Sequence, residues 1–228
     1  MNNIANKGCL YVVATPIGNL NDITYRAINI LKSVDVILAE DTRVTKKLLT
    51  NFQIHKPVFH YDDYCNENCW KKILFWLESN KNVAFVTDAG TPNISDPGYK
   101  LINSIRSSDK TIKIIPIPGP SAITTVLSVA GVNANQFTFV GFPPSKKGRE
   151  KFFKALDKIN IRPIILFESC HHLKKLFDDL QKFCYCKNII VAKELTKIYE
   201  EIWQGTPAEA AKYFVDKKAQ GEFVIIIF

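Results

Sequence analysis

The sequence lacks the features that would place it in a membrane or on a secretory route. Among its 228 residues, no apolar run approaches the ~20 residues that a membrane-spanning helix needs. The N-terminus, MNNIANKG, has no positively charged region followed by a long apolar one, which is the pattern of a signal peptide. We therefore expect a cytoplasmic protein.

The common motifs for nucleotide binding and hydrolysis are also absent. There is no GxxxxGK[ST] loop for a nucleoside triphosphate, no HExxH zinc motif and no GxSxG nucleophile elbow. The first strand-like run, residues 9–14, leads into TPIGNL, which has one glycine where a dinucleotide fingerprint has three. These absences disfavour an NAD-dependent oxidoreductase and the commonest class of methyltransferase.

The six cysteines do not form a metal-binding pattern. Cys65 and Cys69 are spaced as CxxxC, Cys184 and Cys186 as CxC, and no nearby histidine completes a zinc finger. We therefore predict free thiols, as in a reducing cytosol, with no disulfide and no bound metal.

Basic residues exceed acidic ones. The 30 Lys and Arg against 22 Asp and Glu give a formal net charge of +8. Counterion release favours binding of a polyanion such as RNA to a basic surface. An ordinary lysine-rich, solvated surface would give the same excess, so charge alone leaves both interpretations open.

Strand-like apolar runs alternate with stretches of helical period, which predicts an α/β protein with mainly parallel sheets. The predicted strands are residues 9–14, 36–39, 57–61, 83–87, 112–117, 137–140, 164–168, 189–192, 198–203 and 223–228. The predicted helices are 23–34, 66–79, 97–107, 121–130, 149–158, 171–182 and 207–218, with Asp22 and Asp96 as N-caps of the first and third. Prolines clustered around Gly119 indicate a junction between two lobes, residues 1–118 and 119–228.

The most informative segment is VTDAGTPNISDPG, residues 86–98. A strand ends here in an irregular turn before a helix begins, and this geometry places a ligand at the carboxyl edge of a sheet. The turn offers small residues, backbone groups, hydroxyls and the Asp88 carboxylate, but no basic residue. Such a lining suits a neutral or zwitterionic ligand better than a polyphosphate. Without a ligand, Asp88 would be an ordinary turn former.

Charged side chains follow the strand at 36–39. Glu40, Asp41 and Arg43 should reach the carboxyl edge of the sheet, where α/β enzymes place reacting groups, unless they form only a surface ion pair. A carboxylate beside Arg43 should stay ionised, because a nearby opposite charge favours the charged form.

Two segments are candidates for contact with RNA phosphate. A short basic loop beside Phe142, suited to phosphate contact and base stacking, contains Lys146, Lys147 and Arg149. The turn around Asn19 leads into a helix whose N-terminus could seat a phosphate. A solvated loop and a tight turn shaped by proline and glycine are the alternatives.

Eight segments, in order, match one family: LYVVATPIGNLNDIT (10–24), LAEDTR (38–43), VTDAGTPNISDPG (86–98), IPGPSA (117–122), FTFVGFPPSKKGR (137–149), FES (167–169), KELTK (193–197) and QGEFVIII (220–227). Over almost its whole length the chain closely resembles the bacterial ribosomal small-subunit cytidine 2′-O-methyltransferases. These have the tetrapyrrole methylase-like fold and use S-adenosylmethionine. The resemblance implies two α/β lobes with the cofactor folded into the cleft between them.

The resemblance also implies roles for individual residues. Those that would contact the cofactor are Asp88, Ala89, Gly90, Ile94, Ser95, Ser121, Ala122, Leu195 and Thr196. This agrees with the absence of basic residues from the turn, since S-adenosylmethionine has no phosphate. The methyl acceptor would be a cytidine 2′-hydroxyl in the decoding region of 16S rRNA. Asp41, Glu40 and Glu194 are candidate general bases, and Arg43 would neutralise an adjacent phosphate. The expected partners are 16S rRNA within the small ribosomal subunit and a second copy of the chain.

The sequence departs from the family in two places. Cys170, His171 and His172 stand where the family usually has Pro-His-Arg, so a phosphate contact of that arginine is missing unless protonated His172 replaces it. The sequence also ends at Phe228, where many relatives continue, so any RNA docking by that segment would come from elsewhere. Two other functions stay open: a methyltransferase of the same fold acting on a tetrapyrrole or another small molecule, and an RNA-binding protein without activity.

Overall fold

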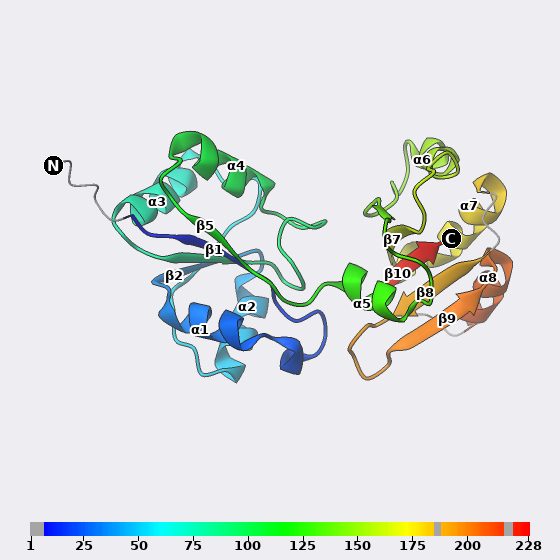
Figure 1. Ribbon diagram of the computed structural model, residues 1–228, viewed down its shortest axis with the longest axis horizontal. Coiled ribbons are helices and arrows are strands. Elements are labelled where there is room, and N and C mark those ends of the chain that lie inside the picture. The colour runs from blue at the N-terminus through cyan, green and yellow to red at the C-terminus, as the bar shows by residue number, and fades with distance from the viewer. Residues whose placement is uncertain (1–6, 185–187, 217–220) are drawn as a thin grey trace. The chain divides into compact units, whose positions relative to one another are not determined.

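The computed structural model describes residues 7–184, 188–216 and 221–228. It divides into two compact units, Met1–Ser121 and Ala122–Phe228, and each has its own five-stranded sheet (Figure 1). The junction predicted from the sequence lies between residues 118 and 119. In the described part of the chain, no helix is both long and apolar enough to cross a bilayer.

The first unit is a parallel sheet with helices on both faces (Figure 1). Its strands, β1 (Leu10–Val13), β2 (Val36–Ala39), β3 (Val58–His60), β4 (Val83–Val86) and β5 (Ile114–Ile117), lie in the order β3-β2-β4-β1-β5. Its helices are η1 (Leu20–Asp22), α1 (Tyr25–Ser33), α2 (Thr42–Asn51), α3 (Glu67–Glu78) and α4 (Tyr99–Ser108). Since every pairing is parallel, the strands end at one common edge.

Alternate residues of the central strands enter two apolar clusters. In β2, Ile37 and Ala39 pack with the buried residues of α1 and α2, whereas Val36 and Leu38 pack with those of α3 and α4. The strand is therefore buried on both faces, and its sequence is accordingly a continuous apolar run. This burial fixes the direction in which β2 delivers the polar residues that follow it.

The second unit has a mixed sheet. Its strands, β6 (Thr138–Phe139), β7 (Ile164–Ser169), β8 (Ile189–Lys193), β9 (Glu201–Gly205) and β10 (Glu222–Ile227), lie in the order β6-β7-β10-β8-β9. Its helices are α5 (Ala122–Val129), α6 (Arg149–Leu156), η2 (Cys170–His172), α7 (Leu173–Phe183) and α8 (Pro207–Asp216). One apolar cluster joins α6, α7 and α8 to one face of this sheet.

The prediction of mainly parallel sheets is correct for the first unit and wrong for the second. In the second unit, β10 runs antiparallel to β7 and β8, and β8 runs antiparallel to β9. The segment between β8 and β9 contains no crossover helix, so these two strands can pair only as an antiparallel hairpin. The hydrophobic pattern of a buried strand does not reveal the direction of its neighbours.

Three local predictions are also corrected. Thr24, not Asp22, caps α1, because its side chain accepts from the Ala27 N–H at 3.1 Å. Gly98, with φ of 140°, precedes α4 in place of Asp96, because the Asn93 N–H donates to the Pro97 carbonyl at 3.1 Å and closes a turn there. Helix α2 was not predicted. Of its three buried residues, Thr45 is polar and Leu48 and Leu49 are adjacent, so the sequence shows no clear apolar repeat of helical period.

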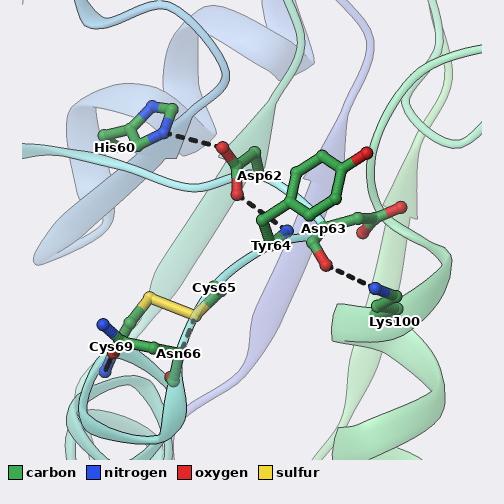
Figure 2. Close-up of a disulfide and its surroundings, with 8 residues drawn as sticks. All are labelled: His60, Asp62, Asp63, Tyr64, Cys65, Asn66, Cys69 and Lys100. Carbon is green, nitrogen blue, oxygen red and sulfur yellow. Dashed lines mark hydrogen bonds and ion pairs between the residues drawn. A yellow bond between two sulfur atoms is a disulfide. The ribbon is translucent and has the colours of Figure 1, made fainter.

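A disulfide joins Cys65 to Cys69, so the prediction of free thiols is wrong for this pair (Figure 2). Asn66 caps α3 by accepting from the Cys69 N–H at 3.0 Å, and this first helical turn brings together two cysteines four residues apart. Just before Cys65, the carbonyl of Asp63 accepts a hydrogen bond of 2.6 Å from Nζ of Lys100, which is on α4. Cys9 and Cys170 are free, Cys184 Sγ donates to the Phe153 carbonyl at 3.3 Å, and Cys186 lies outside the described residues.

Candidate active site

Polar segments follow the strands of the first unit at its carboxyl edge, and hydrogen bonds link them. The Asp41 N–H, just after β2, donates to Asp88 Oδ1, just after β4, at 3.0 Å. Thr15 Oγ1, just after β1, donates to the Thr87 carbonyl at 3.1 Å. The edge thus holds the segments after β1, β2 and β4 in fixed register, as expected for a site at the ends of parallel strands.

The turn after β4 is fastened on two sides. Thr15 and Gly90 exchange two backbone hydrogen bonds, of 2.9 and 3.0 Å, and Thr91 Oγ1 donates to the Pro120 carbonyl at 3.2 Å. Gly90 has φ of +83°, and a Cβ atom there would lie 3.3 Å from Ile17 Cγ2. Both the backbone conformation and the space therefore favour glycine at this position.

A pocket of about 180 Å³ opens at this edge, and it is lined by Thr15, Pro16, Leu20, Val44, Thr45, Lys47, Leu48, Thr87 and Asp88. The hydroxyl of Thr87 is buried, and it has no hydrogen-bond partner within the described protein. Buried polar atoms are rarely left unpaired, so this hydroxyl is a candidate contact for a bound molecule.

The two carboxyl groups after β2 have pKa values shifted in opposite directions. Burial raises the pKa of Glu40, and the nearby charge of Asp88 raises it further. Hydrogen bonds from Arg43 hold the pKa of Asp41 far below its usual range, with Arg43 Nη2 at 2.6 Å from Oδ2 and Nε at 3.1 Å from Oδ1. Asp41 is therefore ionised, as the sequence predicts, and Glu40 is the stronger base of the two.

The loop between β8 and β9, in the second unit, holds Glu194, Leu195 and Thr196. Glu194 and Thr196 have φ of 51° and 67°, which is uncommon for residues other than glycine and an outlier for a β-branched threonine. Such strained backbone concentrates at functional sites. The Thr196 hydroxyl, like that of Thr87, is buried with no partner within the described residues.

Glu194 is engaged in the loop itself. Its Oε1 accepts from Lys197 Nζ at 2.9 Å and from the Glu222 N–H at 3.1 Å. Burial acts to raise the pKa of Glu194, but these two hydrogen bonds outweigh it and the pKa is lowered. A carboxylate held in this way shapes the loop and is a weak proton acceptor.

The remaining candidate residues lie in the turn before α4, at the boundary between the two units and at the start of η1. Ile94 and Ser95 are exposed in the turn before α4, and Ser95 has φ of 64°. Ser121 is the last residue of the first unit and Ala122 begins α5. Asn19 is exposed and caps η1, since its side chain accepts from the Asn21 N–H at 3.0 Å.

The basic loop divides into exposed and buried residues. Lys146 and Lys147 are exposed, but Arg149 is 4% exposed, and the interpretation of Arg149 as a phosphate ligand is therefore wrong. Its Nε donates to Asp179 Oδ2 at 2.5 Å, and its Nη1 lies 3.5 Å from Glu168 Oε2. The guanidinium is therefore buried and paired with these two carboxylates. Arg149 begins α6, and its partners come from β7 and α7, so local sequence could not reveal them.

His172 and the possibility of a metal site are the last sequence features to place. His172, the suggested substitute for the family's arginine, is half-buried and directly precedes α7. Within the described ranges, no group of three His, Cys, Asp or Glu side chains gathers as a metal site.

The sequence model of the Tetrapyrrole (Corrin/Porphyrin) Methylases matches residues 9–211. The chain belongs to this family. Its fold agrees with solved members. A cobalt precorrin-4 methyltransferase of cobalamin biosynthesis superposes with a TM-score of 0.68 at 18% identity, over 96% of this chain and 93% of that one. The uroporphyrin-III C-methyltransferase of Thermus thermophilus gives 0.67 at 15% identity, over 96% and 94%. The predicted α/β fold of tetrapyrrole methylase type is therefore confirmed.

Curated relatives place the chain within one branch of the tetrapyrrole methylase family. A Synechocystis protein named ribosomal RNA small subunit methyltransferase I is 42% identical over 222 residues, which cover 96% of this chain and 78% of the relative. A Thermotoga maritima protein of the same name is 40% identical over 220 residues, covering 96% and 98%. At these identities the chain is a member of the ribosomal RNA small subunit methyltransferase I family, and the predicted resemblance is confirmed.

Proposed function

We propose that the protein transfers a methyl group from S-adenosylmethionine to the ribose 2′-hydroxyl of a cytidine in 16S rRNA, in the decoding region of the small subunit. The observation that carries this proposal is the turn at Asp88, which contains no basic residue and is hydrogen-bonded to the segment that bears Glu40 and Asp41. The relatives' name supports rRNA as the acceptor.

The residues of the turn after β4 fit S-adenosylmethionine. The turn from Asp88 to Thr91 contains no cation that would suit a phosphate, Gly90 occupies a place that a side chain would fill, and the Thr87 hydroxyl lacks a partner. When bound, S-adenosylmethionine supplies an activated methyl group. We assign its contacts to Asp88, Ala89, Gly90, Ile94, Ser95, Ser121, Ala122, Leu195 and Thr196.

Glu40 accepts the proton of the acceptor hydroxyl in this proposal. Burial and the charge of Asp88 raise its pKa above the ordinary value of a glutamate, and the higher pKa makes its carboxylate a stronger base. Asp41 is too strongly stabilised by Arg43 for that role, and it holds the start of α2 by accepting from the Arg43 N–H at 2.8 Å. The exposed Arg43 keeps further N–H donors for a neighbouring RNA phosphate.

RNA is proposed to contact Lys146, Lys147 and Asn19, which are all exposed. The net charge of +8 supports a polyanionic substrate. A homodimer and a cytoplasmic location remain predictions, and sedimentation of the purified protein would test the first.

The deciding experiment is methyl transfer from labelled S-adenosylmethionine into small ribosomal subunits that lack the modification. We expect label on one cytidine ribose, mapped by nuclease digestion and mass spectrometry. Label on a base, or no label in RNA under conditions where a tetrapyrrole is methylated, would contradict the proposal. Calorimetry with S-adenosylmethionine and with NAD separates this function from an oxidoreductase, since binding of the first alone is expected.

A further inference from the structure

In the second unit, helix α6 and the residues on either side of it line a surface depression, which we call the lysine groove. It is an open depression of about 650 Å³ lined by Lys146, Gly148, Arg149, Glu150, Lys151, Lys154, Ala155 and Lys158. All four of its lysines are exposed. The charge of Arg149 is already matched inside the protein by Glu168 and Asp179, so the outward charge comes from the lysines and one glutamate.

The spacing of these lysines places them along one face. Lys151, Lys154 and Lys158 are three and four residues apart, whereas Phe153 and Leu156 enter the core on the other side of α6. The residue after α6, Asp157, keeps helical angles of −63° and −26°, which extends the row toward Lys158. At a rise of about 1.5 Å per residue, the row is about 10 Å long.

The groove keeps an excess of positive charge. Lys154 pairs with Glu150 at 2.6 Å, but both side chains are about 60% exposed, at 59% and 61%. An exposed pair of this kind contributes little and is easily exchanged for another partner. The lining then contains four lysines against one glutamate, an arrangement that is complementary to a polyanion.

Hydrogen bonds hold the loop before α6 in place. Arg149 Nη1 donates to the Pro144 carbonyl at 3.1 Å, and Lys175 Nζ from α7 donates to the Ser145 carbonyl at 3.2 Å. These contacts tie the loop to the body of the second unit, so little backbone order remains to be gained when a ligand binds.

We propose that the lysine groove binds the phosphodiester backbone of the RNA substrate and does not read its sequence. The lining contains no aromatic side chain for base stacking and no amide side chain for base edges, whereas lysines contact phosphates as point charges. This inference rests on the proposed function for the nature of the substrate. It adds Lys151, Lys154 and Lys158 to the contacts expected from the loop before α6.

The test compares two triple variants of equal charge. Lys151→Ala/Lys154→Ala/Lys158→Ala removes the row in the groove, and Lys32→Ala/Lys110→Ala/Lys113→Ala removes three exposed lysines of the first unit. Binding to an oligouridylate and to small ribosomal subunits is measured at several salt concentrations. Each contact with a single-strand phosphate contributes ~0.7 to the steepness of the slope of log affinity against log salt concentration. We therefore expect the slope of the groove variant, which lacks three lysines, to be less steep by about 2. The control should keep the wild-type slope.

The outcomes separate this inference from the proposed function. Equal slopes for the two triple variants would overturn the groove, whatever the methylation assay shows. A lowered slope on oligouridylate, with no methylation of subunits by the wild type, would keep the groove and remove the activity. Wild-type binding to phosphatidylserine vesicles without binding to oligouridylate would also overturn it. The triple Lys→Arg variant should retain the wild-type slope.

Discussion

At the scale of single residues, the edge of the first sheet separates two neighbouring carboxyl groups by their surroundings. Burial and the charge of Asp88 raise the pKa of Glu40, whereas Arg43 lowers that of Asp41. The two adjacent acids therefore differ in basicity, and Asp41 in addition caps α2 and pairs with Arg43. The sequence predicted that both lie at this edge and that a carboxylate beside Arg43 is ionised, but it could not rank them, because the raised pKa of Glu40 depends on its burial and on Asp88 from another strand.

Glu40→Gln should lower the rate of methyl transfer by ~10²–10⁴-fold, the usual contribution of a positioned base. Because the pKa of Glu40 is raised, the wild-type rate should fall as the pH drops through a value above the ordinary 4.5 for a glutamate. Single-turnover rates measured over a range of pH give both quantities. Glu78→Gln, at an exposed glutamate at the end of α3, is the control and should keep the wild-type rate and pH profile. Near-normal turnover of Glu40→Gln would move the search to Asp41 and Glu194.

Gly90→Val should abolish S-adenosylmethionine binding, measured by calorimetry. The valine would adopt φ of +83°, and its Cβ would press against Ile17 beside the proposed ligand contacts. Gly131→Val is a matched control, because Gly131 also has a positive φ, of +65°, and a Cβ there would meet nothing within 4 Å. Equal losses of affinity in both variants would attribute the effect to backbone strain alone.

At the scale of elements, the sequence predicted strands better than helix ends. Strand β2 has the predicted bounds, because burial on both faces leaves an unmistakable apolar run. Helix α2 was missed because one of its three buried residues, Thr45, is polar and the other two, Leu48 and Leu49, are adjacent, so no apolar repeat of helical period is apparent. The burial of the Arg149 side chain was also not predicted, because its partners Glu168 and Asp179 lie on other elements.

Arg149→Ala should therefore destabilise the second unit by about 3–5 kcal/mol, since it leaves two carboxylates without their buried counter-charge. Denaturant unfolding followed by circular dichroism measures the change. Lys147→Ala, two residues away and exposed, should change the unfolding free energy by less than about 0.5 kcal/mol. If both variants unfolded at the wild-type denaturant concentration, the buried cluster would have no part in stability.

At the scale of the whole molecule, the fold class followed from the alternation of strand-like and helical segments. The mixed second sheet did not follow, because a strand buried on both faces has the same pattern whichever way its neighbours run. The candidate site shows the same division. Its residues could be placed at strand ends from the sequence, whereas their hydrogen bonds and pKa shifts depend on contacts between segments far apart in the chain.

The last prediction concerns both units together. Each has its own core, and the proposed cofactor contacts come from both, at residues 88–90, 94, 95 and 121 in the first and at 122, 195 and 196 in the second. A ligand that contacts both should therefore slow hydrogen exchange in residues 86–98 and in 189–203. It should also stabilise the folded protein by about 2.7 kcal/mol at a concentration ~100-fold above its dissociation constant. Hydrogen–deuterium exchange with and without S-adenosylmethionine measures the protection. NAD at the same concentration is the control and should protect neither segment. Protection by S-adenosylmethionine restricted to one unit would show that the contacts assigned to the other are incorrect.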